Sequence, residues 1–178
     1  MLILLIAFSL ALLDQSTKYL IRSRLDLGDS VAVIDGFFNI GYVRNSGAAW
    51  GMLAGFGTGL IVLSVVMLIV LVAFRKHFIT DTLPHRIATG LMLAGIVGNL
   101  IDRVRLGYVV DFLHFYWRQH SFPSFNVADS AICVGVVIYM ISQMIESRAG
   151  EGLTDSASTD LPGASDAPIE GGEESLTP

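Results

Sequence analysis

The sequence is poor in charge and has a single cysteine, and both scarcities limit what the protein can be. Only 15% of its 178 residues are charged, whereas 53% are hydrophobic, and the mean hydropathy is +0.63. Soluble domains usually carry about 25% charged residues, so this composition excludes an ordinary soluble globular protein. With Cys133 alone, the chain can form neither an internal disulfide framework nor a CxxC metal or redox site.

Basic residues are too few to suggest nucleic-acid binding. The net charge of −5 originates in residues 149–178, which hold seven acidic groups and no basic one, whereas residues 1–148 have a net charge of +2. We therefore expect no nucleic-acid partner. Because residues 149–178 have almost no large apolar side chains, we expect them to form an acidic disordered tail.

Long apolar runs dominate the rest of the sequence. We expect one membrane domain, residues 1–148, with four spanning helices at about 1–20, 53–74, 87–103 and 127–147. The second run is the clearest, because an uncharged stretch of that length crosses roughly 30 Å of hydrocarbon. The first run lacks the preceding basic residues of a cleaved signal peptide, so we expect it to be retained. In the third run Gly90, Ala94 and Gly98 recur every fourth residue, which favours close helix packing.

The connection between the first two runs carries the signature of a β-hairpin. Residues that favour strands flank the pair Asp35-Gly36, an arrangement typical of a tight turn; they are Val31, Val33, Phe37, Ile40, Tyr42 and Val43. A second β-like piece, 104–110, lies between the third and fourth runs. The sequence therefore predicts an all-α integral membrane protein with a small extramembrane β-sheet on one face.

Basic residues give two interpretations of the orientation. By count, seven of the eleven lie in the first and third connections, which would make those connections cytoplasmic. By density, the short loop 75–86 is the most basic connection, with three basic residues in twelve, which would make that loop cytoplasmic. We adopt the density interpretation, which places that loop and both termini in the cytoplasm.

Ionisable side chains near the ends of the apolar runs are the first candidates for functional residues. Placing such a group at membrane depth costs several kcal/mol of free energy unless it is paired, so its presence needs an explanation. Asp14 and Lys18 are four residues apart on one helix face and can form an ion pair. An ordinary interfacial pair at a helix end explains them equally well. Asn99, Asp102 and Arg103 share a stripe at the end of the third run.

Two further carboxylates lie on either side of one connection. Asp111 follows two valines in an apolar stretch, and Asp129 lies at the entrance to the fourth run. Capping of a helix N-terminus can account for Asp129 but not for Asp111. If the two carboxylates meet, they share one proton and supply a general base and a general acid for hydrolysis of a peptide bond.

Other chemistries find less support in the sequence. His114 and His120 lack an HExxH pattern and a third ligand, so we expect no metal site. Ser46 and Ser130 have no Ser-Lys or Ser-His signature, and no glycine-rich phosphate or dinucleotide loop is present. A small transporter is an alternative, because carboxylates in membranes also mark proton paths, and a scaffold without catalysis is another.

Five motifs follow one another along the chain: DQSTK at 14–18, RNSGAAWG at 44–51, GNLIDRV at 98–104, VDF at 110–112 and FNVADS at 125–130. In this order they resemble the motifs of the lipoprotein signal peptidases, the type II signal peptidases of bacteria. The likeness extends from about residue 10 to residue 145. The acidic tail has no counterpart in the family pattern.

The resemblance implies an aspartic endopeptidase of the bacterial inner membrane. Such an enzyme removes the signal peptide of a diacylglyceryl-modified prolipoprotein by cleaving before the lipidated lipobox cysteine. Motif matching makes Asp111 and Asp129 the catalytic pair. The remaining matched residues divide into substrate-binding residues (Asn45, Asn99, Arg103 and Asn126) and residues that support the site (Asp14, Lys18 and Asp102).

The resemblance has further implications for the membrane arrangement. It implies four spanning helices, cytoplasmic termini, an active site near the outer face, sensitivity to globomycin, and no cofactor. We expect a monomer whose partners are prolipoproteins and membrane lipids.

Overall fold

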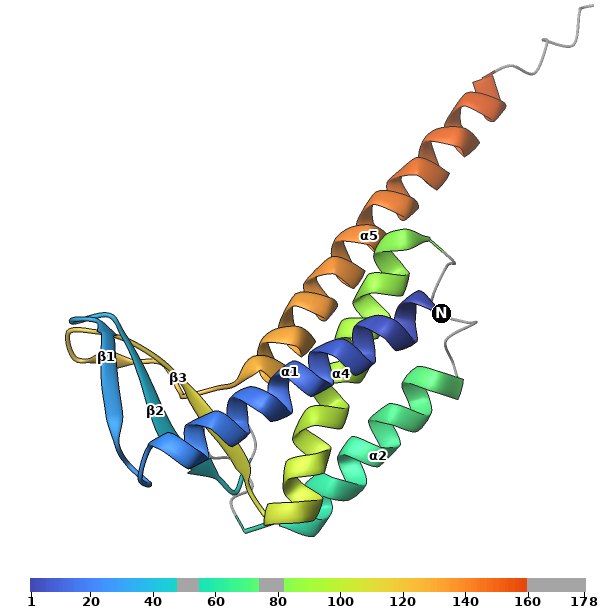
Figure 1. Ribbon diagram of the computed structural model, residues 1–178. Coiled ribbons are helices and arrows are strands. Elements are labelled where there is room, and N and C mark those ends of the chain that lie inside the picture. The colour runs from blue at the N-terminus through green and yellow to red at the C-terminus, as the bar shows by residue number, and fades with distance from the viewer. Residues whose placement is uncertain (48–54, 74–81, 160–178) are drawn as a thin grey trace, which may run out of the picture. The chain divides into compact units, whose positions relative to one another are not determined.

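The computed structural model describes residues 1–47, 55–73 and 82–159 (Figure 1). The chain divides into two compact units, Met1–Gln143 and Met144–Pro178. The elements in chain order are α1 (Leu2–Arg24), β1 (Ser30–Ile34), β2 (Phe38–Asn45), α2 (Gly57–Ala73), α4 (Leu83–Leu106), β3 (Val109–Trp117), β4 (His120–Ser121) and α5 (Val127–Thr159).

Three of the helices are long and apolar enough to cross a membrane: α1, α4 and the part of α5 from Val127 to Arg148. They correspond to the first, third and fourth predicted spans. Helix α2 is apolar but has 17 residues, about 26 Å at 1.5 Å per residue, which is short of a full hydrocarbon core. Of the rest of the second predicted span, Gly55 and Phe56 precede the helix, and 53–54 and 74 lie outside the described residues.

Helix α4 is packed against both α1 and α2, and in Figure 1 it crosses α1. The small-residue stripe predicted in this helix has the expected effect. A Cβ on Gly90 would meet Ile6 of α1, and a Cβ on Gly98 would lie 2.6 Å from Asp14 Oδ2 of α1 and 3.2 Å from Ala128 Cβ of α5. The stripe therefore lets α1 and the first turns of α5 approach the α4 backbone.

The C-terminal helix is longer than the sequence predicts. Helix α5 continues to Thr159, so the residues up to that position are helical, whereas we expected disorder from residue 149. A helix that is already nucleated extends at a small cost per residue, so polar composition alone does not end it. Residues 160–178 of the predicted tail lie outside the described residues.

The four strands found in the described part of the chain form one antiparallel sheet in the order β1-β2-β3-β4. The predicted hairpin is confirmed: β1 pairs with β2, and Gly36 in the turn has φ 76°, a left-handed conformation that glycine adopts without strain. The second predicted β-piece, 104–110, is mostly wrong. Its first residues complete α4, which ends at the left-handed Gly107, and β3 begins only at Val109.

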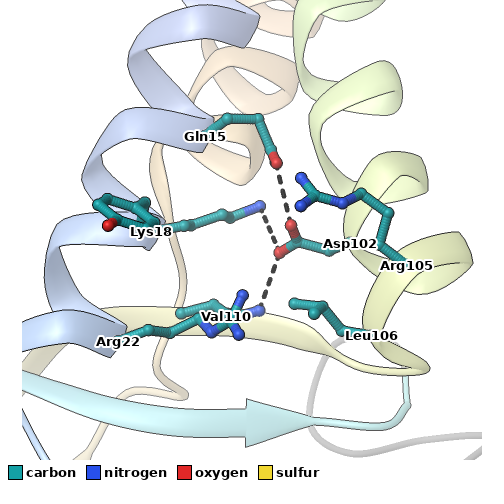
Figure 2. A pocket seen from close by; sticks show the side chains of 8 residues that line it. Gln15, Lys18, Arg22, Asp102, Arg105, Leu106 and Val110 are labelled. Atoms are coloured by element: carbon teal, nitrogen blue, oxygen red, sulfur yellow. Dashed lines mark hydrogen bonds and ion pairs between the residues drawn. The ribbon is translucent and has the colours of Figure 1, made fainter.

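The start of β3 forms hydrogen bonds with both of its neighbours, β2 and the end of α4. In the sheet, Asp111 is paired with Val43 and Val109 with Asn45 of β2. On the other side, the backbone N–H of Val110 donates to Asp102 Oδ2 of α4 at 3.0 Å (Figure 2). This attachment places Asp111 between the end of α4 and the end of β2.

Candidate active site

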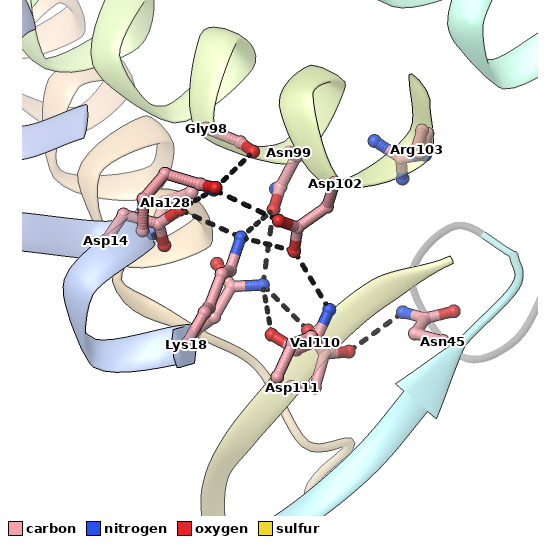
Figure 3. A network of polar contacts seen from close by, with 12 residues as sticks. Asp14, Lys18, Asn45, Gly98, Asn99, Asp102, Arg103, Val110, Asp111 and Ala128 are labelled. Atoms are coloured by element: carbon pink, nitrogen blue, oxygen red, sulfur yellow. Dashed lines mark hydrogen bonds and ion pairs between the residues drawn. The ribbon is translucent and has the colours of Figure 1, made fainter. Parts of the chain in front are cut away.

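A buried polar network occupies the junction of α1, α4, β3 and the start of α5 (Figure 3). It contains six side chains that are at most 6% exposed, namely Asp14, Lys18, Asn99, Asp102, Asp111 and Asn126. Asp129 joins it from the first turn of α5, and Asn45 joins it from β2. The structure thus brings together eight of the nine residues predicted for the site, from segments far apart in the sequence.

Lys18 is the centre of the charged half of this network. Its Nζ lies 2.9 Å from Asp14 Oδ2 and 3.1 Å from Asp102 Oδ2, and it donates to Asn99 Oδ1 at 2.9 Å. These three acceptors match the three donors of an ammonium group. The predicted pair of Asp14 and Lys18 therefore exists, and it is buried inside the protein at 1% and 2% exposure instead of lying at an exposed helix end.

The two carboxylates that pair with Lys18 also accept hydrogen bonds from backbone N–H groups. Asp102 accepts from the N–H of Val110, and Asp14 Oδ1 accepts from the N–H of Ala128 at 2.9 Å. Val110 directly precedes Asp111, and Ala128 directly precedes Asp129. The ion-paired cluster therefore positions the backbone immediately before each of the two remaining carboxylates.

Asparagine side chains hold the carboxylates of Asp111 and Asp129. Asp111 accepts from Asn45 Nδ2 at 2.9 Å and from Asn126 Nδ2 at 2.7 Å. Asp129 Oδ1 accepts from Asn99 Nδ2 at 2.7 Å, and Asn126 Nδ2 is also 3.2 Å from Asn99 Oδ1. Asp111 and Asp129 are therefore connected through Asn126 and Asn99.

Helix capping explains only part of the position of Asp129. The Oδ1 atom of Asn126 accepts from the N–H of Asp129 at 2.9 Å, and Asp129 Oδ2 accepts in return from the N–H of Asn126 at 3.3 Å. This reciprocal arrangement is a capping box at the start of α5, with Asn126 as the cap. It uses one oxygen of Asp129, and the other oxygen faces Asn99.

Burial, the largest cause, and the negative charge of Asp129 raise the pKa of the Asp111 carboxyl to about 7. The hydrogen bonds from Asn45 and Asn126 act in the opposite direction, because they favour the ionised form. Near neutral pH, Asp111 therefore exchanges a proton readily, as a general acid or base must.

Arg103 lies beside this network without a hydrogen bond to it among the described residues. Its Nη2 donates to the carbonyl oxygen of Gly47 at 3.3 Å, and its charge interacts with Asp129 and Asp111. Figure 3 shows its side chain apart from the linked carboxylates, with no dashed line joining it to them. Of the nine predicted residues, Arg103 is the one placed at the rim.

Gln15 is a member of the network that sequence reasoning did not assign to the site. Its Nε2 donates to Asp102 Oδ1 at 3.0 Å and to the carbonyl oxygen of Gly98 at 3.1 Å, so it links α1 to α4. The signal was present in the sequence, because Gln15 is adjacent to Asp14 and three residues before Lys18, on the same helix face.

Within residues 1–47, 55–73 and 82–159, no group of three or more His, Cys, Asp or Glu side chains is placed to hold a metal ion. The His114 Nε2 atom, considered as a ligand in the sequence, is 2.6 Å from Ser121 Oγ across the β3–β4 hairpin.

Comparison with known proteins gives a consistent result. The profile of the family described as Signal peptidase (SPase) II matches residues 6–145. The lipoprotein signal peptidase of Geobacter sulfurreducens is 50% identical over 140 residues, which cover 76% of this chain and 87% of that protein. The lipoprotein signal peptidase of Bacillus pumilus is 46% identical over 144 residues, covering 80% of this chain and 92% of that protein.

A solved structure gives the same picture at the level of the fold. A bacterial membrane enzyme determined by the in meso method superposes with a TM-score of 0.73 at 41% identity, covering 82% of this chain and 88% of that one. With its apolar helices of spanning length, the protein is a multi-pass membrane protein. Together, the matched profile, the relatives and the fold show that the chain belongs to the signal peptidase II family, the lipoprotein signal peptidases.

Proposed function

We propose that this protein removes the signal peptide of diacylglyceryl-modified prolipoproteins by cleaving before the lipidated lipobox cysteine, with Asp111 and Asp129 as an aspartic catalytic pair. The observation that carries the proposal is the connection of these two carboxylates through Asn126 and Asn99. Membership of a peptidase family argues against the transporter and scaffold alternatives.

The chemistry follows from one proton shared by two carboxyl groups. The ionised carboxylate takes a proton from water while the water oxygen attacks the scissile carbonyl carbon. The protonated carboxyl donates a hydrogen bond to the carbonyl oxygen, which carries the developing negative charge. When the tetrahedral intermediate collapses, the C–N bond breaks and the carboxyl that gained the proton from water transfers it to the leaving amine.

The hydrogen bonds in the site refine the roles of the asparagines. Asn45, Asn99 and Asn126 each direct an amide N–H to Asp111 or Asp129. We therefore assign them first to orienting the two carboxylates. Arg103, at the rim, is the residue we assign to binding the extended backbone of the substrate, because its guanidinium presents several donors.

Exposed apolar residues on the sheet are consistent with a substrate that is anchored in the membrane. Strand β1 and the hairpin turn expose Val31, Val33, Ile34 and Phe37, an apolar set suited to the boundary between headgroups and hydrocarbon. A diacylglyceryl group anchored in the bilayer would keep the cleavage point near this boundary. The enzyme then needs to bind only a short stretch of peptide backbone.

Several properties accompany this proposal. The site lies near the outer face of the bacterial inner membrane and both termini are cytoplasmic, with α2 as part of a fourth span. The enzyme works as a monomer without a cofactor, and globomycin inhibits it.

The test is cleavage of a purified diacylglyceryl-modified prolipoprotein by the full-length protein in detergent or lipid. An unlipidated substrate is the control, and Asp111→Asn and Asp129→Asn are assayed in parallel. We expect cleavage before the lipidated cysteine by the wild type alone. Turnover retained in both variants would exclude the catalytic pair, and equal cleavage of the unlipidated substrate would exclude the substrate class.

A further inference from the structure

A polar pocket of about 80 Å³ lies where the last turns of α1 and α4 meet the start of β3 (Figure 2). Its lining includes three basic side chains, Lys18, Arg22 and Arg105, and one carboxylate, Asp102. A single water molecule needs roughly 10–15 Å³ of such space, so the pocket accommodates a small polar group. Asp111 and Asp129 are not among the residues that line it.

The charges at the inner end of this pocket are already satisfied. Lys18 is paired with Asp14 and Asp102. Asp102 accepts hydrogen bonds from Gln15 Nε2 and from the N–H of Val110. Its Oδ2 atom also lies 3.1 Å from Lys18 Nζ. The inner end therefore presents a closed network with little remaining capacity for a ligand.

The outer end carries two positive charges that nothing in the described chain neutralises. Arg22 in the last turn of α1 and Arg105 in the last turn of α4 are both exposed. Within residues 1–47, 55–73 and 82–159, neither forms a salt bridge, and no dashed line in Figure 2 joins either of them to another lining residue. Even with Asp14 included, three basic groups face two carboxylates, so the pocket is positive overall.

We propose that this pocket binds the phosphate group of an anionic phospholipid, with Arg22 and Arg105 donating to the phosphate oxygens. A guanidinium presents a planar fork of donors that matches phosphate oxygens. Both arginines end helices of membrane-spanning length, which is where lipid headgroups lie. Tyr19, 72% exposed at the edge of the pocket, is the aromatic type found at this level of a bilayer.

The positions of Arg22 and Arg105 can also be explained without a ligand, and a comparison with Arg24 separates the two explanations. Basic residues in the last turn of a helix interact favourably with the helix dipole, which requires no bound phosphate. Arg24 is also exposed in the last turn of α1, but it does not line the pocket. A dipole effect or a general attraction to anionic membranes predicts similar behaviour for Arg22 and Arg24, whereas a phosphate site predicts that Arg22 matters more.

The experiment measures lipid binding by the full-length protein in a neutral detergent. Phosphatidylglycerol is added in increasing amounts, phosphatidylcholine serves as the neutral lipid, and the shift of the unfolding midpoint reports binding. We expect the wild type to prefer phosphatidylglycerol. The double variant Arg22→Gln/Arg105→Gln should bind it roughly 25-fold more weakly, at about fivefold for each arginine. Arg24→Gln should remain within about twofold of the wild type.

Two further arms make the result decisive. Arg22→Lys/Arg105→Lys keeps the charge and loses the fork, so we expect an intermediate affinity even if the glutamine variant folds poorly. Inorganic phosphate, tested alone, separates two sources of the same group: binding of phosphatidylglycerol only identifies a lipid site, and equal binding of phosphate identifies a site for the free ion. The proposal is overturned if the double variant binds phosphatidylglycerol as tightly as the wild type, or if Arg24→Gln loses as much affinity.

This inference does not depend on the proposed catalytic pair. Neither Arg22 nor Arg105 contacts Asp111 or Asp129 among the described residues, so prolipoprotein cleavage by the double variant is measured separately. A loss of lipid binding with cleavage intact would support the phosphate site without bearing on the peptidase mechanism.

Discussion

Replacing Lys18 with methionine should destabilise the protein by about 3–5 kcal/mol, the usual cost of removing one partner of a buried ion pair. The Nζ atom of Lys18 lies within 3.1 Å of both Asp14 Oδ2 and Asp102 Oδ2, and the side chain is 2% exposed. Methionine fills much of the same space, so an empty cavity contributes little to the loss. The cost arises because two carboxylates remain buried without a positive charge beside them.

A triple variant separates this charge effect from other consequences of the substitution. Asp14→Asn/Lys18→Met/Asp102→Asn leaves no charge in the cluster. Each new asparagine keeps a carbonyl oxygen that can accept from the backbone N–H of Ala128 or Val110, as the carboxylates do. We expect the triple variant to recover most of the lost stability, because a complete set of buried charges can often be replaced at little cost.

The assay is denaturant unfolding of the purified proteins in the same detergent, followed by circular dichroism. Arg24→Met is the matched control, because it removes a positive charge that is exposed on the same helix. If Lys18→Met lies within about 1 kcal/mol of the wild type, the pairing does not have the energetic role assigned to it. A triple variant less stable than Lys18→Met would also refute the reasoning.

Three further predictions test other parts of the structure. Because the pKa of Asp111 is raised to about 7, its contribution to stability is present below about pH 4 and is lost as the pH rises through about 7; Asp111→Asn should flatten thermal stability over that window. Gly98→Ala should cost about 1–3 kcal/mol in denaturant unfolding, because its Cβ would lie 2.6 Å from Asp14 Oδ2, whereas the control Gly57→Ala has no atom within 4 Å of the new methyl group and should change stability little. Deleting residues 152–178 should leave prolipoprotein cleavage near the wild-type rate, because the polar contacts of the proposed site come from residues 14–129; a large loss of cleavage would show that the tail has a role.

The sequence alone determined the features of the fold that depend on neighbouring residues. Apolar runs predicted the spanning helices α1, α4 and α5, and Asp35-Gly36 between strand-forming residues predicted the β1–β2 hairpin. Helical spacing likewise predicted the pair of Asp14 and Lys18. These predictions succeed because period and turn chemistry act over a few residues.

Element boundaries were less well determined. The sequence indicated a strand over 104–110, but α4 continues to Leu106 and is capped by the left-handed Gly107. A composition typical of disorder did not end α5, which is helical to Thr159. In both cases an established helix continued through residues whose own preferences pointed elsewhere.

Only the tertiary structure decided how the polar residues meet. Nothing in the spacing of Asp111 and Asp129 shows that Asn126 both caps α5 and contacts Asp111, or that Asp14 and Asp102 hold the backbone before each carboxylate. The pocket between Arg22 and Arg105 likewise requires α1 and α4 to end side by side. Such contacts join residues far apart in the chain, and they follow from the packing of helices and strands that local sequence preferences do not specify.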